Sequence, residues 1–268
     1  MVKVAILGST GMLGNAVAQH FLNNDNYEVF LSSRDDTCEN KGYFYFDALN
    51  PTACMLPKVD YVINCIGVIK PFMKNGIENA IVINSIFPHT FSAFCKSNNI
   101  KMIHITTDCV FSGKTGRYSE SSHHDCLDEY GKTKSLGEPE NCMVIRTSII
   151  GAEVKNNVSL VEWVRSQKGK EVKGFTNHLW NGVTTTEYAK ICDQIIQKNL
   201  YKEDLYHVHS NYVNKFELLN LISESLSLGL EVQPHQTEVS CDRTLMTEKD
   251  LMSKLEISTL EEQIENLK

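Results

Sequence analysis

Near its start the sequence reads Val4-Ala5-Ile6-Leu7-Gly8-Ser9-Thr10-Gly11-Met12-Leu13-Gly14. Four apolar residues, typical of a buried strand, precede glycines at GxxGxxG spacing, and a helical pattern follows over residues 15–22. Glycines in such a turn let the backbone approach a pyrophosphate, whose charge is met by the free N–H groups of the following helix. We therefore predict a dinucleotide-binding turn whose contact residues are Gly8, Thr10, Gly11, Met12, Leu13 and Gly14.

The rest of the first two thirds alternates short apolar runs with longer helical stretches, such as residues 78–96. This alternation is typical of βαβ units with a parallel sheet. Most of the runs are continuously apolar, as expected when helices cover both faces of the sheet. The expected class is α/β, with a Rossmann-type doubly wound parallel sheet built from strands at 3–7, 28–32, 43–46, 61–65, 102–106 and 142–146.

After about Gly151 the regular alternation of short apolar runs and helical stretches changes. A helical stretch over 159–167 is followed by a polar segment, 169–182, which we expect to be a loop, and by a helix over 185–198. A late strand at 205–209 is expected to return to the sheet, and helices after 214 are separated by an extended piece that contains Pro234. We predict a cofactor domain at 1–150, with 183–210 returning to it, and a smaller, intertwined C-terminal α/β lobe at 151–182 and 211–268.

The composition excludes several classes of protein. Of 268 residues, 42% are hydrophobic and 22% charged, which argues against disordered, collagenous and coiled-coil chains. A net charge of -7 disfavours nucleic acid or an acidic membrane as the main partner. No apolar run is long enough to span a bilayer, no signal-peptide pattern is present, and the nine cysteines form no CxxC pair. We expect a cytoplasmic protein with free thiols, no membrane or nucleic-acid partner and no metal site.

The end of the second strand selects the cofactor. An acidic residue there would bind a ribose 2′-hydroxyl, whereas an arginine accommodates a 2′-phosphate. The residues at this place are Leu31-Ser32-Ser33-Arg34-Asp35. Ser33 and Arg34 favour NADPH, while Asp35 keeps NADH open. Asp47, after the third strand, is placed either to accept from the adenine amino group or to act as an ordinary turn residue.

A candidate catalytic group lies in the middle of the chain, where Tyr130 and Lys134 form a YxxxK pair. On a helix, residues four apart share one face, so the ammonium can lower the pKa of the phenol and make Tyr130 a usable general acid for a carbonyl oxygen. Thr107 follows the strand at 102–106, at the sheet edge where ligands bind in open parallel sheets. We expect Thr107 to hydrogen-bond the same carbonyl.

Two further stretches belong with these motifs: Asp108-Cys109-Val110-Phe111-Ser112-Gly113 and Arg146-Thr147-Ser148. Together the motifs resemble the extended short-chain dehydrogenase/reductases and, within them, the dTDP-4-dehydrorhamnose reductases. The resemblance implies NADPH-dependent reduction of the C4 ketone of a 4-keto-6-deoxy sugar nucleotide in deoxysugar biosynthesis, by a triad of Thr107, Tyr130 and Lys134. It places residues 64–67 along the cofactor and the nucleotide sugar in the C-terminal lobe, and we expect a homodimer. Expected further contacts are Cys65, Ile66 and Gly67, Tyr130 and Lys134 with the cofactor, and Val68, Thr107, Asp108, Cys109, Trp180 and Arg243 with the substrate; Trp180 equally suits a packed residue of a loop.

Two departures from the family pattern leave alternatives open. Cys109 stands where the related dehydratases carry glutamate, which argues against dehydratase activity. Rhamnose-type reductases usually carry tyrosine at the place of Cys109 and an aromatic residue at the place of Ile149. Cys109, with His178 as candidate partner, would suit a bifunctional 3- or 5-epimerase and 4-reductase of a UDP- or GDP-4-keto-6-deoxy sugar, including N-acetylamino sugars. The remaining alternative is a noncatalytic NADP-binding regulatory subunit, because the methionine adenosyltransferase beta subunit resembles the same family.

Overall fold

The computed structural model describes residues 1–35, 42–74, 76–154 and 157–267. Its centre is a sheet of seven strands in the order β11-β6-β5-β4-β1-β2-β3, and every neighbouring pair is parallel. The order reverses beside β1, which is the mark of a doubly wound sheet, so the predicted fold class is confirmed. The strands are β1 (Val2–Leu7), β2 (Tyr27–Ser33), β3 (Tyr43–Tyr45), β4 (Tyr61–Asn64), β5 (Lys101–Thr107), β6 (Met143–Thr147) and β11 (Asp204–His207).

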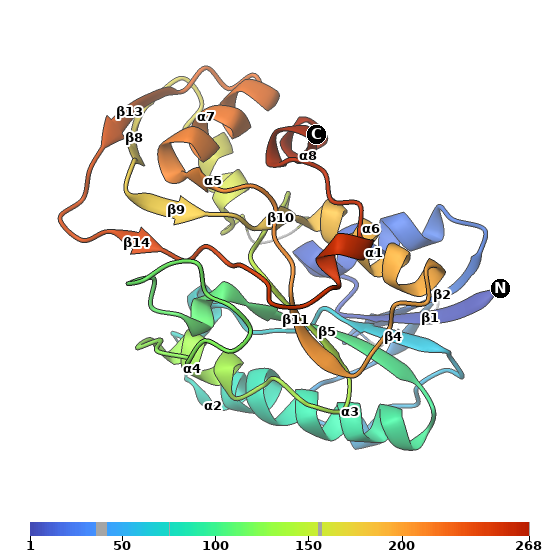
Figure 1. The fold of residues 1–268 in the computed structure, drawn as a ribbon. Coiled ribbons are helices and arrows are strands. Elements are labelled where there is room, and N and C mark those ends of the chain that lie inside the picture. Colours follow the sequence, from blue (N-terminus) through green and yellow to red (C-terminus); the bar gives the residue numbers. More distant parts are fainter. Residues whose placement is uncertain (36–41, 75, 155–156, 268) are drawn as a thin grey trace.

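Helices cover both faces of this sheet (Figure 1). Alternate residues of β1 separate the two cores: Val4 and Ile6 face α1 (Met12–Leu22) and α6 (Thr185–Gln197), whereas Ala5 and Leu7 face α3 (Phe87–Ser97). Both sets are fully buried, which explains why these strands read as continuous apolar runs. Because all seven strands run in the same direction, their carboxyl ends lie along one edge of the sheet, and the turns that follow them lie close together.

The segment predicted as one helical stretch over 78–96 is interrupted. It consists of α2 (Glu78–Ile81), a π-helical turn (Val82–Ile86) and α3. A π turn inserts an extra residue into a helix and is often found at functional sites. Here it turns the side chain of Asn84 into the interior, where that residue is 1% exposed.

The C-terminal lobe surrounds a separate apolar core formed by α5 (Leu160–Ser166), α7 (Lys215–Ser225) and α8 (Leu260–Glu265). The expectation of a polar loop at 169–182 is wrong. Two strands form there because distant segments supply their backbone partners: β8 pairs with β13, and β9 pairs with β12 and β14. The small strands are β7 (Ile149–Ile150), β8 (Glu171–Phe175), β9 (His178–Trp180), β10 (Val183–Thr184), β12 (Val213–Asn214), β13 (Glu231–His235) and β14 (Cys241–Asp242).

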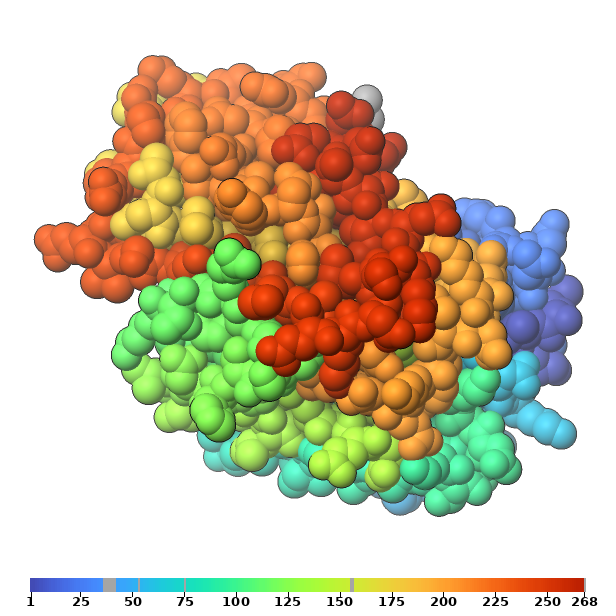
Figure 2. Space-filling model, viewed as in Figure 1, coloured from blue at the N-terminus to red at the C-terminus, as the bar shows by residue number. Residues whose placement is uncertain are grey.

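A segment from β14 to about residue 249 joins the two lobes. Its Asp242 N–H donates to Gly113 O at 2.7 Å, and its Met246 N–H donates to Tyr118 O at 2.8 Å. Figure 2 shows the late part of the chain, in red, lying between the green atoms of the middle of the chain and the orange atoms of the C-terminal lobe. Among the described residues, no helix is long and apolar enough to cross a bilayer and no cluster of ligands suits a metal ion.

Candidate active site

The turn after β1 is packed so closely that it requires glycine at two positions. Gly8 adopts a φ of +75°, and a Cβ added there would lie 3.0 Å from Cγ1 of Ile66. A Cβ on Gly14 would lie 2.1 Å from Gly8 O, because α1 passes directly over the turn. The backbone of the turn therefore lies directly against α1, with no room for a side chain at Gly8 or Gly14.

The N-terminus of α1 opens this turn to an anion. Gly11 is the N-cap and offers no side chain to the free N–H groups, and the first turn of the helix contains no acidic residue. Thr10 and Gly11 are exposed, whereas Leu13 and Gly14 are buried. The positive end of an 11-residue helix thus remains available, so the residues present fit the pyrophosphate of a dinucleotide.

The end of β2 holds the turn in place. The Gly8 N–H donates to Oγ of Ser32 at 2.9 Å, and the Ser9 hydroxyl donates to Ser32 O at 2.7 Å. Arg34 follows β2 directly, two residues after Ser32, and its side chain is exposed. Asp47 is half-buried, and its Oδ1 accepts from the Leu49 N–H at 3.0 Å, as a turn residue would.

The turn after β4 carries the predicted contacts Cys65, Ile66, Gly67 and Val68. Its position depends on Asn84, which the sequence reasoning missed. The Asn84 carboxamide accepts from the Val68 N–H at 2.8 Å and donates to Val68 O at 2.9 Å and to the Thr133 hydroxyl at 3.1 Å. Asn84 therefore links this turn to the helix that carries Tyr130, and no local pattern around it signals that link.

Helix α4 (Glu129–Ser135) presents Lys134 to the end of the sheet. The side chain of Asp128 caps the helix by accepting from the Gly131 N–H at 2.9 Å. Lys134 is 4% exposed, and its Nζ donates to Ile105 O at 3.1 Å. Burial lowers the pKa of Lys134 to about 8, and the carboxylate of Glu138 opposes this shift.

Thr107 ends β5, Tyr130 lies in α4, and Lys134 of the same helix reaches β5 at Ile105 O. The prediction that the ammonium lowers the pKa of the phenol is wrong for this structure. Burial raises the pKa of Tyr130 above its usual range, Cys109 adds to the shift, and a hydrogen bond with the Thr107 side chain opposes it. Burial outweighs the neighbouring groups here, while the ammonium of Lys134 is bonded to a backbone carbonyl. Tyr130 consequently keeps its proton and can donate it.

On the far side of Thr107, the C-terminal lobe contributes two cations. Nε of Arg243 donates to Phe111 O at 3.0 Å, and its Nη1 lies 3.9 Å from Sγ of Cys109. Lys215 lies with its Nζ 5.1 Å from the ring centroid of Trp180, which is itself buried. Both cations act on the buried carboxyl of Asp108, whose pKa is raised by burial and lowered by Arg243 and then by Lys215. Sequence reasoning missed Lys215 because the residues around it indicate only the start of a helix.

Cys109 is not equipped as a base. Burial and, less strongly, the adjacent Asp108 raise the pKa of its thiol to about 12, while Arg243 opposes the shift. The predicted partner, His178, lies in β9, where its Nε2 is 2.9 Å from the Thr237 hydroxyl and its ring packs on Phe175. Within the described ranges His178 has no hydrogen bond to Cys109. The structure thus does not bring these two side chains together as a proton-transfer pair, and the epimerase alternative receives no support from it.

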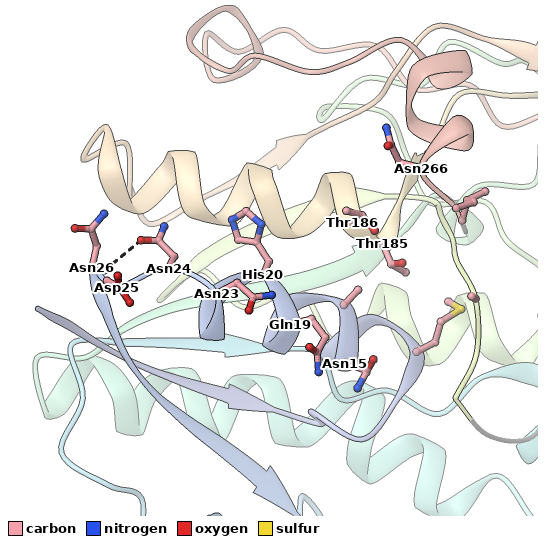
Figure 3. Close-up of a pocket in the computed structure, with 14 residues that line it drawn as sticks. Asn15, Gln19, His20, Asn23, Asn24, Asp25, Asn26, Thr185, Thr186 and Asn266 are labelled. Atoms are coloured by element: carbon pink, nitrogen blue, oxygen red, sulfur yellow. Dashed lines mark hydrogen bonds between the residues drawn. The ribbon is translucent and has the colours of Figure 1, made fainter.

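A groove of about 830 Å³ runs along α1 and the start of α6 (Figure 3), and no residue of the predicted triad lines it. Carboxamides line much of it, including those of Asn15 and Gln19. Of its described lining residues, Met12 alone belongs to the predicted site. The side chains at the carboxyl ends of β1, β4 and β5, rather than this groove, therefore define the candidate active site.

Comparison with known proteins finds relatives over most of the chain. A family model described as the RmlD substrate binding domain matches residues 2–265. A dTDP-4-dehydrorhamnose reductase of Aggregatibacter actinomycetemcomitans is 24% identical over 226 residues, which cover 77% of this chain and 73% of that protein. Methionine adenosyltransferase 2 subunit beta of Danio rerio is 24% identical over 84% of this chain and 74% of its own length.

Solved structures share the fold over nearly the whole chain. The crystal structure of a dTDP-4-dehydrorhamnose reductase from Bacillus anthracis in complex with NADP has a TM-score of 0.80 and 20% identity, and covers 99% of this chain and 98% of that one. A likeness at this identity concerns the fold. The match to the family model, in contrast, extends from β1 to α8.

Proposed function

The chain belongs to the RmlD substrate binding domain family, and on that premise we propose that it reduces the C4 ketone of a 4-keto-6-deoxy sugar nucleotide with NADPH. The observation that carries the proposal is that Lys134 bonds Ile105 O, two residues before Thr107 at the carboxyl end of β5, from the helix that also carries Tyr130. The relatives named as dTDP-4-dehydrorhamnose and dTDP-4-keto-6-deoxy-D-glucose reductases support this class of substrate and a role in deoxysugar biosynthesis.

The cofactor would lie across the carboxyl ends of β1, β2 and β4. The glycine turn of residues 8–14 and the open N-terminus of α1 would hold its pyrophosphate. Ser33 and Arg34 would contact the 2′-phosphate of NADPH, Asp47 the adenine, and Cys65, Ile66 and Gly67 the nicotinamide half. When bound, NADPH supplies the hydride that the carbonyl carbon accepts.

The proton for the carbonyl oxygen comes from the phenol of Tyr130, which burial keeps protonated. The Thr107 hydroxyl, which donates to Oδ1 of Asp108 at 3.1 Å in this structure, would turn to hold the same oxygen beside the phenol. Lys134, whose pKa of about 8 leaves it mostly charged near neutral pH, would stabilise the phenolate formed as the proton leaves. The ketone thereby gains a hydride at carbon and a proton at oxygen and becomes a secondary alcohol.

The nucleotide sugar would bind between the two lobes, with residues 151–182 and 211–268 forming its lobe and 1–150 with 183–210 that of the cofactor. Val68, Asp108 and Cys109 would face the sugar from the sheet side. Arg243 and Lys215 would face the substrate from the other lobe, and Trp180, which is 4% exposed and packs in the core of that lobe, would support Lys215 instead of contacting the substrate as expected. The absence of an acidic partner within ion-pair distance of Arg243 or Lys215, among the described residues, supports a polyanionic substrate.

The test measures NADPH oxidation with a panel of dTDP-, UDP- and GDP-linked 4-keto-6-deoxy sugars, together with the stereochemistry of each product. Tyr130→Phe is expected to lower kcat by about a hundredfold or more, the usual scale of general acid catalysis, with little change in the Kd of NADPH. Binding of NADPH without turnover of any sugar in the panel would instead favour a noncatalytic regulatory subunit.

We also propose a homodimer in a reducing compartment such as the cytoplasm. Exposed apolar side chains gather around α3 and the end of α4, where Ile86 is 51%, Phe94 45% and Leu136 68% exposed. Covering such a face in a dimer would stabilise it. Every cysteine among the described residues is free, which suits a reducing compartment. Sedimentation of the wild type and of Phe94→Glu would show whether this face forms the dimer.

A further inference from the structure

His104 lies in the middle of β5, is fully buried, and has no part in the chemistry proposed above. We propose that His104 is a positioning residue that couples the cofactor-binding turn after β4 to the helix that carries Tyr130 and Lys134. The inference rests on the proposed function, because it concerns the alignment of cofactor and proton donor in that site.

Three hydrogen bonds form the bridge, and their directions follow from the groups involved. Oδ1 of Asn64 accepts from the Ile66 N–H at 3.1 Å, so the amide nitrogen of Asn64 faces Nδ1 of His104 at 2.9 Å. An amide nitrogen can only donate, so Nδ1 is the acceptor. Nε2 of His104 lies 3.1 Å from Gly137 O, which can only accept, so Nε2 carries the proton. The neutral imidazole thus fills one donor and one acceptor role, each for a different partner.

Both ends of the bridge are attached to the site with little freedom to move. At the first end, Ile66 lies against Gly8, where an added Cβ would be 3.0 Å from Cγ1 of Ile66. At the other end, the Gly137 N–H donates to Lys134 O at 3.0 Å, and an added Cβ on Gly137 would be 1.7 Å from Asn84 O. A shift of the turn after β4 would therefore be passed through the imidazole to the end of α4.

The charge around His104 favours this fixed role. Burial holds the pKa of His104 well below its usual range, and Lys134 lowers it further, while the hydrogen bond to Gly137 opposes the shift. A protonated ring would place a second donor against the amide nitrogen of Asn64 and a second cation near the buried ammonium. The imidazole consequently stays in one tautomer, which gives the bridge a single geometry.

A matched control is present on the neighbouring helix. Nε2 of His89, in α3, lies 2.8 Å from Leu136 O, one residue before Gly137, but His89 is exposed and has no bond to the turn after β4 among the described residues. Removing either histidine takes away an imidazole contact to the end of α4. Removing His104 alone also breaks the connection to the cofactor turn.

Two substitutions cut the bridge at opposite ends. His104→Asn can keep an acceptor near the place of Nδ1 and loses the bond to Gly137, whereas His104→Gln can keep a donor near the place of Nε2 and loses the bond to Asn64. The direct readout is amide hydrogen exchange of residues 131–137 with and without NADPH. We expect NADPH to slow this exchange in the wild type and in His89→Ala, and to leave it unchanged in both His104 variants. We also expect each His104 variant to lower kcat by about tenfold, the effect of one lost buried hydrogen bond, with His89→Ala within about twofold.

The wild-type exchange experiment decides the matter even where a variant fails to fold. NADPH that binds without slowing exchange in residues 131–137 would overturn the coupling, as would His104 variants that retain the full protection. Because this readout needs binding but no turnover, the coupling can hold in a chain that reduces none of the sugars. A chain that does not bind NADPH would refute both proposals.

Discussion

Replacing Gly14 by alanine is expected to weaken NADPH binding far more than it weakens the fold. The new Cβ would lie 2.1 Å from Gly8 O, 2.6 Å from Gly8 C and 2.9 Å from Cα of Ser9. An ordinary contact between carbon and oxygen needs more than 3 Å, so the turn must retreat by about 1 Å, and no rotamer can relieve a clash with backbone atoms. The same Gly8 O accepts from the Gly11 N–H at 2.9 Å, so the retreat also opens the turn.

Overpacking of this kind costs ~1–3 kcal/mol, which corresponds to a rise of about 5- to 150-fold in the Kd of NADPH when the strain falls on the binding-competent turn. Fluorescence titration with NADPH measures the Kd, and urea unfolding measures the free energy of unfolding. Gly169→Ala serves as the control, because its φ of +70° makes it unfavourable for alanine while no atom lies within 4 Å of the added Cβ. A folded Gly14→Ala protein that binds NADPH within twofold of the wild type would refute the reasoning.

Three further predictions concern charged groups. Arg146→Met should lower the free energy of unfolding by about 3–5 kcal/mol in urea titrations, because it leaves the buried carboxylate of Glu138, 2.5 Å from the guanidinium, without its cation; a loss below about 1 kcal/mol would contradict this. Burial and, less strongly, Arg146 lower the pKa of His207 to about 4, so at pH 7 the histidine is neutral in both the folded and the unfolded chain. As the pH falls from about 6.5 toward 4, the unfolded chain binds a proton at this residue and the folded chain does not. Stability should therefore fall over that range by as much as about 3 kcal/mol at this one residue, and a His207→Gln chain with the same pH slope as the wild type would argue against it. Arg34→Ala should raise the Kd of NADPH by about ten- to a hundredfold, the scale of a hydrogen bond to a charged group, and leave that of NADH unchanged; equal effects on both would remove Arg34 from the 2′-phosphate site.

The sequence predicted most of the sheet and the cofactor turn because both depend on neighbouring residues. Strand β1 is buried on both faces and is therefore apolar throughout, and the GxxGxxG spacing is a local requirement of the turn that follows it. The placing of Tyr130 and Lys134 four residues apart on one helix likewise depends only on the helical repeat. Element ends differed from prediction by a residue or two, as between the expected strand at 61–65 and β4 (Tyr61–Asn64).

The predictions that were wrong concern contacts between distant segments. The polar residues around Glu171 gave no sign of a strand, because its partner β13 lies about 60 residues later in the chain and supplies the backbone bonds. The partner assigned to Cys109 failed for the same reason: the pairing of β9 with β12 and β14 determines where His178 lies. In each case the missing information was a tertiary contact.

Taken by itself, the sequence determined the fold class, the glycine turn after β1 and the spacing of Tyr130 and Lys134 on one helix, since repeat and spacing express them locally. The tertiary structure alone decided the protonation of these groups and what supports them. Burial, which no local pattern reports, raises the pKa of Tyr130 and lowers that of Lys134 to about 8. Asn84, Lys215 and His104 reach the site through the packing of elements far apart in the chain, because a buried polar group must find its partner wherever the fold places one.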